Sequence, residues 1–174
     1  MLKGKIILST AIFGFFLYGL PQAMSATLSA DFYTPVENPS AQQAMVVYYR
    51  ITTSVDPVGV AHLYVDREFH NSLRSGEFTT FCIAPGKHTL ESYIKDAPYY
   101  VGKKNNKISF DVKGGSTYFL RVNEVGNGTP QLINRVAAEN ELAGAQRKVR
   151  FLSRASKVQK CDSQKTSPPK TSSR

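Results

Sequence analysis

Apolar and polar residues alternate with a period of two along much of the chain, which predicts β-strands rather than helices. The run 45–51 is rich in β-branched and aromatic residues and predicts a first strand. In the next run, Ala61, Leu63 and Val65 alternate with more polar neighbours, as in a half-buried strand. The same reasoning predicts further strands near 69–73, 77–83, 88–95, 106–112 and 116–124.

Two segments between these runs carry turn chemistry. The segment 84–87 predicts a type II turn, because Pro85 presets φ at the second position and Gly86 accepts a positive φ at the third. Gly114 and Gly115 separate two alternating runs and predict a two-residue hairpin. We therefore interpret these four residues as structural.

The pattern changes in the last third of the chain. Good helix formers over 136–143 predict one helix of two or three turns, and Gly144 is its expected stop. Val149 and Phe151 then alternate with basic residues and predict a final strand.

Short strands joined by turns are typical of an all-β sandwich or barrel. We expect a mostly β fold, a single antiparallel β-sandwich of the immunoglobulin-like or transthyretin-like kind, with one short helix near its C-terminal end. The domain is predicted to span residues 44–161, between a flexible lead-in at 26–43 and a disordered basic tail at 162–174. A domain of this size can fold alone.

The first 25 residues predict a secretory signal peptide. Lys3 and Lys5 precede the apolar run 6–20, and Ala23-Met24-Ser25 fits the small-x-small cleavage rule. The alternative is a membrane anchor, but about 15 apolar residues fall short of the roughly 20 that span a bilayer. We therefore expect an exported protein in the periplasm or at the outer-membrane periphery, with no transmembrane segment after processing.

Net charge is +9, which favours anionic partners. For an exported protein these are lipid headgroups and polyanionic glycans, so peripheral membrane contact agrees with the sequence. We expect no nucleic acid partner. The basic tail after Cys161 is either a weak anchor to such surfaces or a solvated tether.

Cys82 and Cys161 are the only cysteines of the chain. In an oxidising compartment such a pair is expected to form a disulfide. The bridge would close a loop of about 80 residues and stabilise the fold by about 4 kcal/mol in the chain-entropy model. The alternative is a buried Cys82 with a free Cys161.

No catalytic or metal-binding pattern stands out. His62, His70 and His88 lack the paired spacing of metal sites, and we expect them to be ordinary surface histidines. The chain has no G-x-S-x-G elbow and no phosphate-binding glycine loop. We expect no catalytic residues, no metal, no cofactor and no enzymatic activity. A small hydrolase that uses the histidines is the enzymatic alternative.

The loop 97–107 is the candidate partner-binding site. Tyrosines beside lysines suit glycans, anionic headgroups or a protein partner. The alternative is that the tyrosines pack at a strand end and the lysines form a solvated turn. The candidate residues are Tyr99, Tyr100, Lys103, Lys104 and Lys107.

Five segments carry a resemblance to a known family: Phe81–Leu90, Tyr93–Lys104, Gly114–Val122, Glu139–Leu142 and Leu152–Cys161. They resemble the bacterial domain of unknown function numbered twenty-eight forty-six. This is a small β-rich domain of envelope proteins, also found in front of OmpA-type peptidoglycan-binding domains. The resemblance covers about residues 58–161 and implies no catalytic residues. The OmpA-type domain that commonly follows is missing after Cys161, so peptidoglycan binding through that module is not implied.

Compartment and resemblance together lead to one functional hypothesis and one rival. The first is a non-catalytic, exported envelope protein, an accessory or partner-binding module that binds another envelope protein or an anionic envelope or glycan surface. The rival is a secreted or surface factor that binds glycans or components of a host or matrix.

Overall fold

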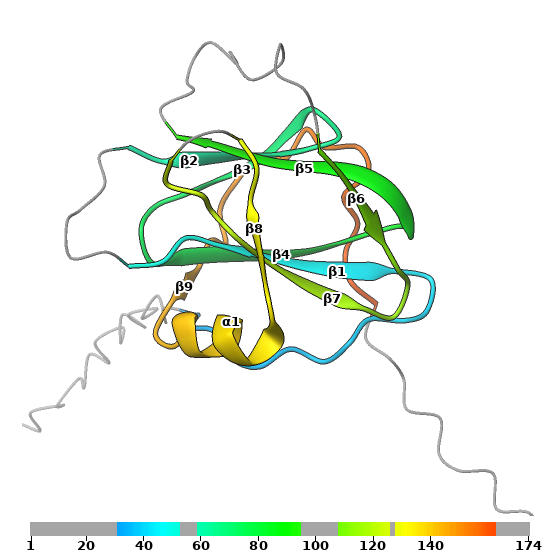
Figure 1. Ribbon diagram of the computed structural model, residues 1–174, viewed down its shortest axis with the longest axis horizontal. Coiled ribbons are helices and arrows are strands. Elements are labelled where there is room, and N and C mark those ends of the chain that lie inside the picture. The colour runs from blue at the N-terminus through cyan, green and yellow to red at the C-terminus, as the bar shows by residue number, and fades with distance from the viewer. Residues whose placement is uncertain (1–30, 53–58, 95–107, 126–127, 163–174) are drawn as a thin grey trace, which may run out of the picture.

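The computed structural model describes residues 31–52, 59–94, 108–125 and 128–162 (Figure 1). Within these ranges the fold is mostly β, with one short helix, as the sequence predicts. The elements are β1 (Ala44–Tyr49), β2 (Ala61–Val65), β3 (Glu68–Leu73), β4 (Glu77–Ile83), β5 (Gly86–Ile94), β6 (Ser109–Val112), β7 (Thr117–Arg121), β8 (Gln131–Ile133), α1 (Arg135–Glu141) and β9 (Gln146–Arg147).

The strands form two sheets that lie one above the other (Figure 1). One sheet has the order β8-β7-β1-β4-β9 and the other has the order β3-β2-β5-β6. The expectation of purely antiparallel sheets is wrong, because β1 pairs in parallel with β7, and β4 pairs in parallel with β9. Parallel neighbours need a long crossover between them, and here the crossovers pass through the other sheet or through α1.

The central strand β1 is buried along its whole length. Successive side chains of a strand point to opposite faces. Ala44, Val46 and Tyr48 face the other sheet and join the core between the sheets, where they pack with residues of β2, β4 and β5. The alternate residues Met45, Val47 and Tyr49 belong to a second core on the outer face of the same sheet.

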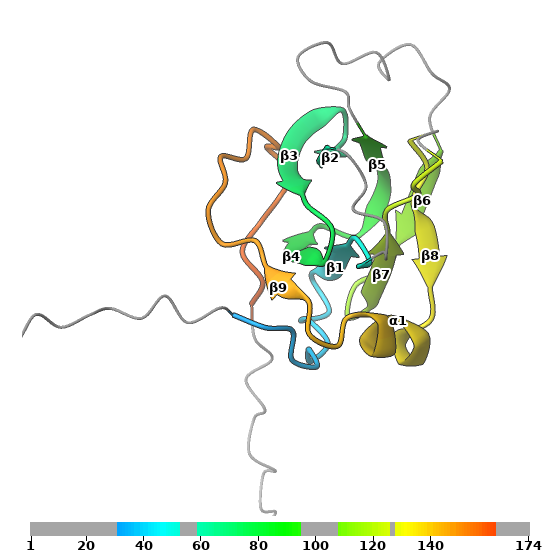
Figure 2. The same ribbon diagram turned by 90° about the vertical axis from the view of Figure 1, so that its left-hand side faces the viewer.

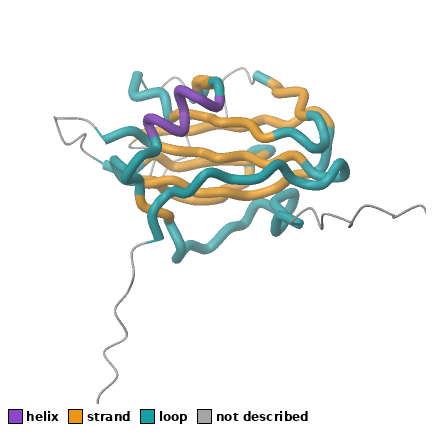
Figure 3. The backbone as a smooth tube through the Cα atoms, turned by 90° about the horizontal axis from the view of Figure 1, so that it is seen from below, coloured by secondary structure: helices purple, strands orange, loops and turns teal. Residues whose placement is uncertain are grey.

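This outer face is covered by α1 and by the segment that precedes β1 (Figure 3). The predicted flexible lead-in, 26–43, lies partly outside the described residues. In its described part the amide of Tyr33 donates to the carbonyl of Ala145 (2.9 Å), and Tyr33 and Val36 pack against the second core.

Helix α1 confirms the predicted helix, with bounds one or two residues earlier. Asn134 is the N-cap, and its side-chain oxygen accepts a hydrogen bond from the amide of Ala137 (3.0 Å). Ala138 and Leu142 are fully buried against the sheet. The chain leaves the helix through Gly144, which has φ +79°.

The predicted hairpin at Gly114 and Gly115 is wrong, because the two strands that it joins, β6 and β7, lie in different sheets. The segment is instead a close crossing between the sheets. A Cβ on Gly114 would lie 1.9 Å from the carbonyl oxygen of Ala41, and Gly115 has φ +72°. At the other predicted turn, Gly86 takes a positive φ of 134°.

Two other differences lie near the C-terminal end. The short strand β8 was not predicted, because three residues after a proline give too little alternation to read. The strand predicted around Val149 and Phe151 is not formed: pairing ends at Arg147, and both side chains are exposed.

Candidate functional site

The loop predicted as the partner-binding site lies outside the described residues. This applies to Tyr99, Tyr100, Lys103, Lys104 and Lys107, whose binding role therefore stays a prediction.

The predicted disulfide between Cys82 and Cys161 is confirmed. Cys82 lies in β4 and is fully buried, and the two Cα atoms are 5.0 Å apart across a sequence separation of 79. Beside the bridge, the backbones of Cys82 and Gln159 exchange two hydrogen bonds, of 3.1 and 2.7 Å. The C-terminal segment is therefore attached to β4 by both covalent and backbone bonds.

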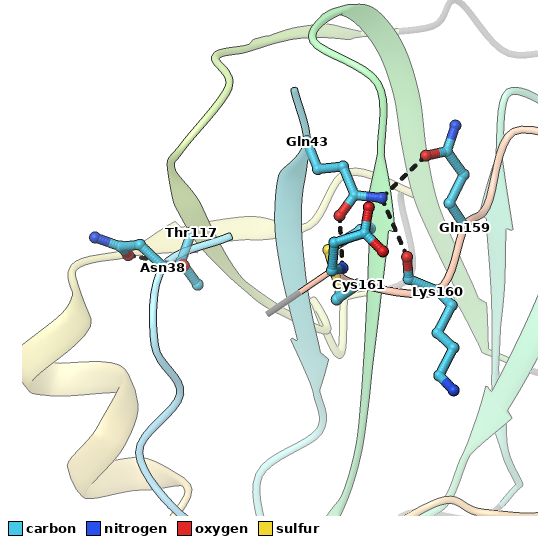
Figure 4. Close-up of a disulfide and its surroundings, with 8 residues drawn as sticks. Asn38, Gln43, Thr117, Gln159, Lys160 and Cys161 are labelled. Atoms are coloured by element: carbon cyan, nitrogen blue, oxygen red, sulfur yellow. Dashed lines mark hydrogen bonds between the residues drawn. A yellow bond between two sulfur atoms is a disulfide. The ribbon is translucent and has the colours of Figure 1, made fainter. Parts of the chain in front are cut away.

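Gln43 holds the same segment from the side of β1 (Figure 4). Its amide nitrogen donates to the side-chain oxygen of Gln159 (3.2 Å) and to the carbonyl of Lys160 (3.1 Å). Its amide oxygen accepts from the backbone amide of Asp162 (2.8 Å). This nearly buried glutamine thus fixes the path of the chain at Cys161.

A small open pocket of about 250 Å³ lies next to the disulfide. Its apolar part comes from Val36, Met45 and Cys161, and its polar part comes from Glu37, Asn38 and Asp162. The Asn38 side-chain oxygen accepts from Thr117 Oγ1 (3.0 Å) and from Arg135 Nη2 (2.9 Å), so its amide is oriented (Figure 4). The pocket is below the usual size of ligand sites.

Two of the three histidines are buried, so the expectation of surface histidines is wrong for His70 and His88. His88 Nδ1 lies 2.7 Å from Asp66 Oδ2, and its Nε2 lies 3.0 Å from the carbonyl of Ala84. Asp66 also accepts from the amide of Thr89 (2.9 Å). These contacts fix the turn between β2 and β3, where Asp66 and Arg67 both take positive φ.

His70 lies between two aromatic rings, with centroids 4.4 Å from that of Phe81 and 5.2 Å from that of Phe151. Its Nδ1 is 3.0 Å from Ser153 Oγ, while its Nε2 has no hydrogen-bond partner. Burial in this apolar setting lowers the pKa of His70 to about 4. The ring is therefore neutral at pH 7 and acts as a packing residue.

Within the part of the chain that the structure describes, no three residues of the types His, Cys, Asp and Glu are grouped so that they could hold a metal ion. In the same residues, no helix has the length and apolar character needed to cross a bilayer.

Sequence reasoning missed an exposed loop of mixed chemistry at 149–154. The sequence predicts a strand around Val149 and Phe151, but both side chains are exposed, as is that of Leu152. Arg150 and Arg154 lie in the same segment. The charge pattern of the sequence indicates an exposed segment here, because 147–160 contains six basic residues and no acidic one.

Neither a family model, nor a curated protein, nor a solved structure matches this chain. The resemblance to the envelope family therefore stays a prediction.

Proposed function

We propose that the protein is a non-catalytic, exported module of the bacterial envelope, located in the periplasm or at the outer-membrane periphery. Its role is to bind another envelope component, either a protein or an anionic surface. The resemblance to the envelope domain family supports the compartment, and the basic charge of the chain supports the kind of partner.

The disulfide is the observation that carries the proposal. Bridges of this kind persist in oxidising compartments and are rare in the reducing cytosol. Cys82 and Cys161 join the body of the sheet to the last described segment. The bond therefore contributes to folding only where the chain is oxidised, which supports function after export.

For the fold type we propose a transthyretin-like sandwich. In the immunoglobulin order the first two strands share one sheet, whereas β1 and β2 belong to different sheets here. The parallel pairing of β1 with β7 at the middle of one sheet supports the same choice. The inner faces of both sheets contribute to one core, which supports the sandwich architecture itself.

Cell fractionation combined with thiol labelling tests the proposal. After expression of the full chain in a bacterium with an envelope, we expect a processed protein in the envelope or periplasmic fraction. In denaturant, which exposes the buried Cys82, both cysteines should resist alkylation until a reductant is added. The Cys161→Ala variant is the control, because it leaves one cysteine that cannot be bridged within the chain. Unprocessed protein in the cytoplasm with two reactive thiols would overturn the proposal.

A further inference from the structure

After β9 the chain leaves the sheets and bulges outward before it returns beside β3 (Figure 2). We call residues 149–154 the anchored loop, because a backbone bond fixes each end. The amide of Lys148 donates to the carbonyl of Phe78 (2.8 Å), and the amide of Arg154 donates to the carbonyl of Phe69 (2.8 Å). All six residues from 149 to 154 are exposed.

Three of the six residues of the anchored loop are apolar and exposed. Val149 is 64% exposed and Leu152 is 80% exposed, while Phe151 is 41% exposed because its ring packs edge-on against His70. Single exposed apolar residues are common on protein surfaces. Three within four positions, on a loop held at both ends, give this short segment a high share of exposed apolar side chains.

Basic residues flank these apolar residues along the chain. The segment 147–160 has six basic residues and no acidic one. Arg147 and Lys148 pair with Asp31 and Glu77, but Arg150 and Arg154 have no ion pair among the residues that the structure describes. The nearest carboxylate on β3, Glu68, accepts hydrogen bonds from the backbone amide and hydroxyl of Ser156. The loop therefore combines unpaired positive charge with apolar surface.

We propose that the anchored loop binds the surface of an anionic lipid bilayer. Val149 and Leu152 would enter the boundary between headgroups and acyl chains, while Arg150 and Arg154 would contact the lipid phosphates. A soluble polyanion such as a glycan would attract the two arginines but would leave Leu152 in water. The combination of cationic and apolar side chains in one short loop thus favours a lipid surface over a polyanion.

The inference rests on the proposed function, because an envelope module meets such lipids, and it identifies the partner surface of that module. The test uses the mature full-length protein and sedimentation with vesicles of neutral phosphatidylcholine, with or without anionic phosphatidylglycerol. We expect sedimentation with the anionic vesicles, weaker at high salt, and little with the neutral ones.

Two double variants separate the components of binding. Arg150→Gln with Arg154→Gln should lower the vesicle partition coefficient about 25-fold, at about fivefold for each charge. Val149→Ser with Leu152→Ser should lower it several-fold, yet leave binding to soluble heparin unchanged. Phe151 is left intact because its ring packs on His70, and thermal melts check that each variant is folded.

The matched control removes two charges from elsewhere. Lys87 is the second residue of β5, in the part that pairs with β6, and Lys113 follows β6. Strand β6 forms the edge of its sheet opposite to β3. Both lysines are exposed. Lys87→Gln with Lys113→Gln should change the partition coefficient less than twofold.

Equal effects of the two charge-removing variants would overturn the proposal, since net charge alone would then account for binding. An unchanged partition coefficient for Val149→Ser with Leu152→Ser would also overturn it and would assign the loop to a polyanion. The vesicle experiment and the cell fractionation test different claims. Retention in the cytoplasm would contradict the proposed function but not vesicle binding by this loop.

Discussion

At the scale of single residues, two of the buried groups that can carry charge, His70 and Arg50, have very different surroundings. His70 is kept neutral between aromatic rings. Arg50 is instead paired with a carboxylate: Glu124 binds its guanidinium through two hydrogen bonds of 2.8 and 2.9 Å, and the carbonyl of Gly59 accepts a third of 2.9 Å. Each arrangement leads to a separate prediction for stability.

Stability should fall as the pH drops from about 6.5 to 4. Since the pKa of His70 is lowered in the folded state, the unfolded chain binds its proton first, at its ordinary pKa near 6.5. The favourable contribution is complete above pH 6.5 and is lost as the pH reaches about 4. A shift of this size corresponds to about 3 kcal/mol of the free energy of unfolding.

Urea unfolding of wild type and His70→Gln across this pH range measures the effect. The variant should lose most of the slope that wild type shows between pH 6.5 and 4. His62→Gln, at a half-buried position where Nδ1 lies 2.8 Å from Ser72 Oγ, should keep the slope. The same pH dependence in wild type and His70→Gln would show that other groups cause it.

Breaking the Arg50–Glu124 pair should strongly lower the free energy of unfolding. The side chain of Arg50 is fully buried and that of Glu124 is 32% exposed. Glu124→Gln leaves a buried cation without its counter-charge, which we expect to cost about 2–4 kcal/mol of unfolding free energy. The pair of Arg135 and Glu139, in which the arginine side chain is 38% exposed and not buried, is the control, and Glu139→Gln should cost about 0.5 kcal/mol or less. Similar midpoints for the two variants in urea would contradict the prediction.

At the scale of elements, the connections between sheets decide the architecture. The two glycines at the crossing from β6 to β7 serve different needs: Gly114 gives room for the carbonyl of Ala41, and Gly115 adopts a positive φ. The amide of Gly115 also donates to the carbonyls of Ser40 (3.1 Å) and Gln43 (2.8 Å). The crossing and the segment before β1 therefore stabilise each other.

Alanine at these two positions should have unequal effects. Gly114→Ala places a methyl group against fixed backbone and should cost more than about 2 kcal/mol, comparable with severe overpacking. Gly115→Ala meets only Cα of Ala41 at 3.8 Å, so its cost is that of a left-handed residue, about 1–2 kcal/mol. Chemical unfolding measures the loss of unfolding free energy in each variant. A loss for Gly115→Ala that equals or exceeds the loss for Gly114→Ala would contradict the prediction.

These elements also show how far sequence reasoning reaches. Alternation located β1 to β7 because that pattern is local to each strand. It could not reveal that Gly114 and Gly115 join different sheets, since this depends on which strands pair at long range. Val149 and Phe151 alternate like a strand, but the chain turns outward there. The pocket beside Cys161 likewise joins residues far apart in sequence.

At the scale of the whole molecule, the disulfide joins the second core to the last described segment. Its removal through Cys82→Ala with Cys161→Ala should lower the free energy of unfolding by about 2–4 kcal/mol, because the unfolded chain regains the freedom of a long loop. Urea unfolding measures this change. A reductant should reproduce it in wild type and have no effect on the variant; an unchanged midpoint for the variant would contradict the prediction.

The same bond determines how the molecule carries mechanical load. Because Cys82 is covalently joined to Cys161, a pull on the two ends passes through residues 31–82 and across the bridge, while residues 83–160 bear no tension. In single-molecule stretching, a reductant should lengthen the extended chain by about 270 Å, the span of the 79 residues released. Equal extension with and without reductant would contradict this. A tether at either end would thus leave the anchored loop unstrained.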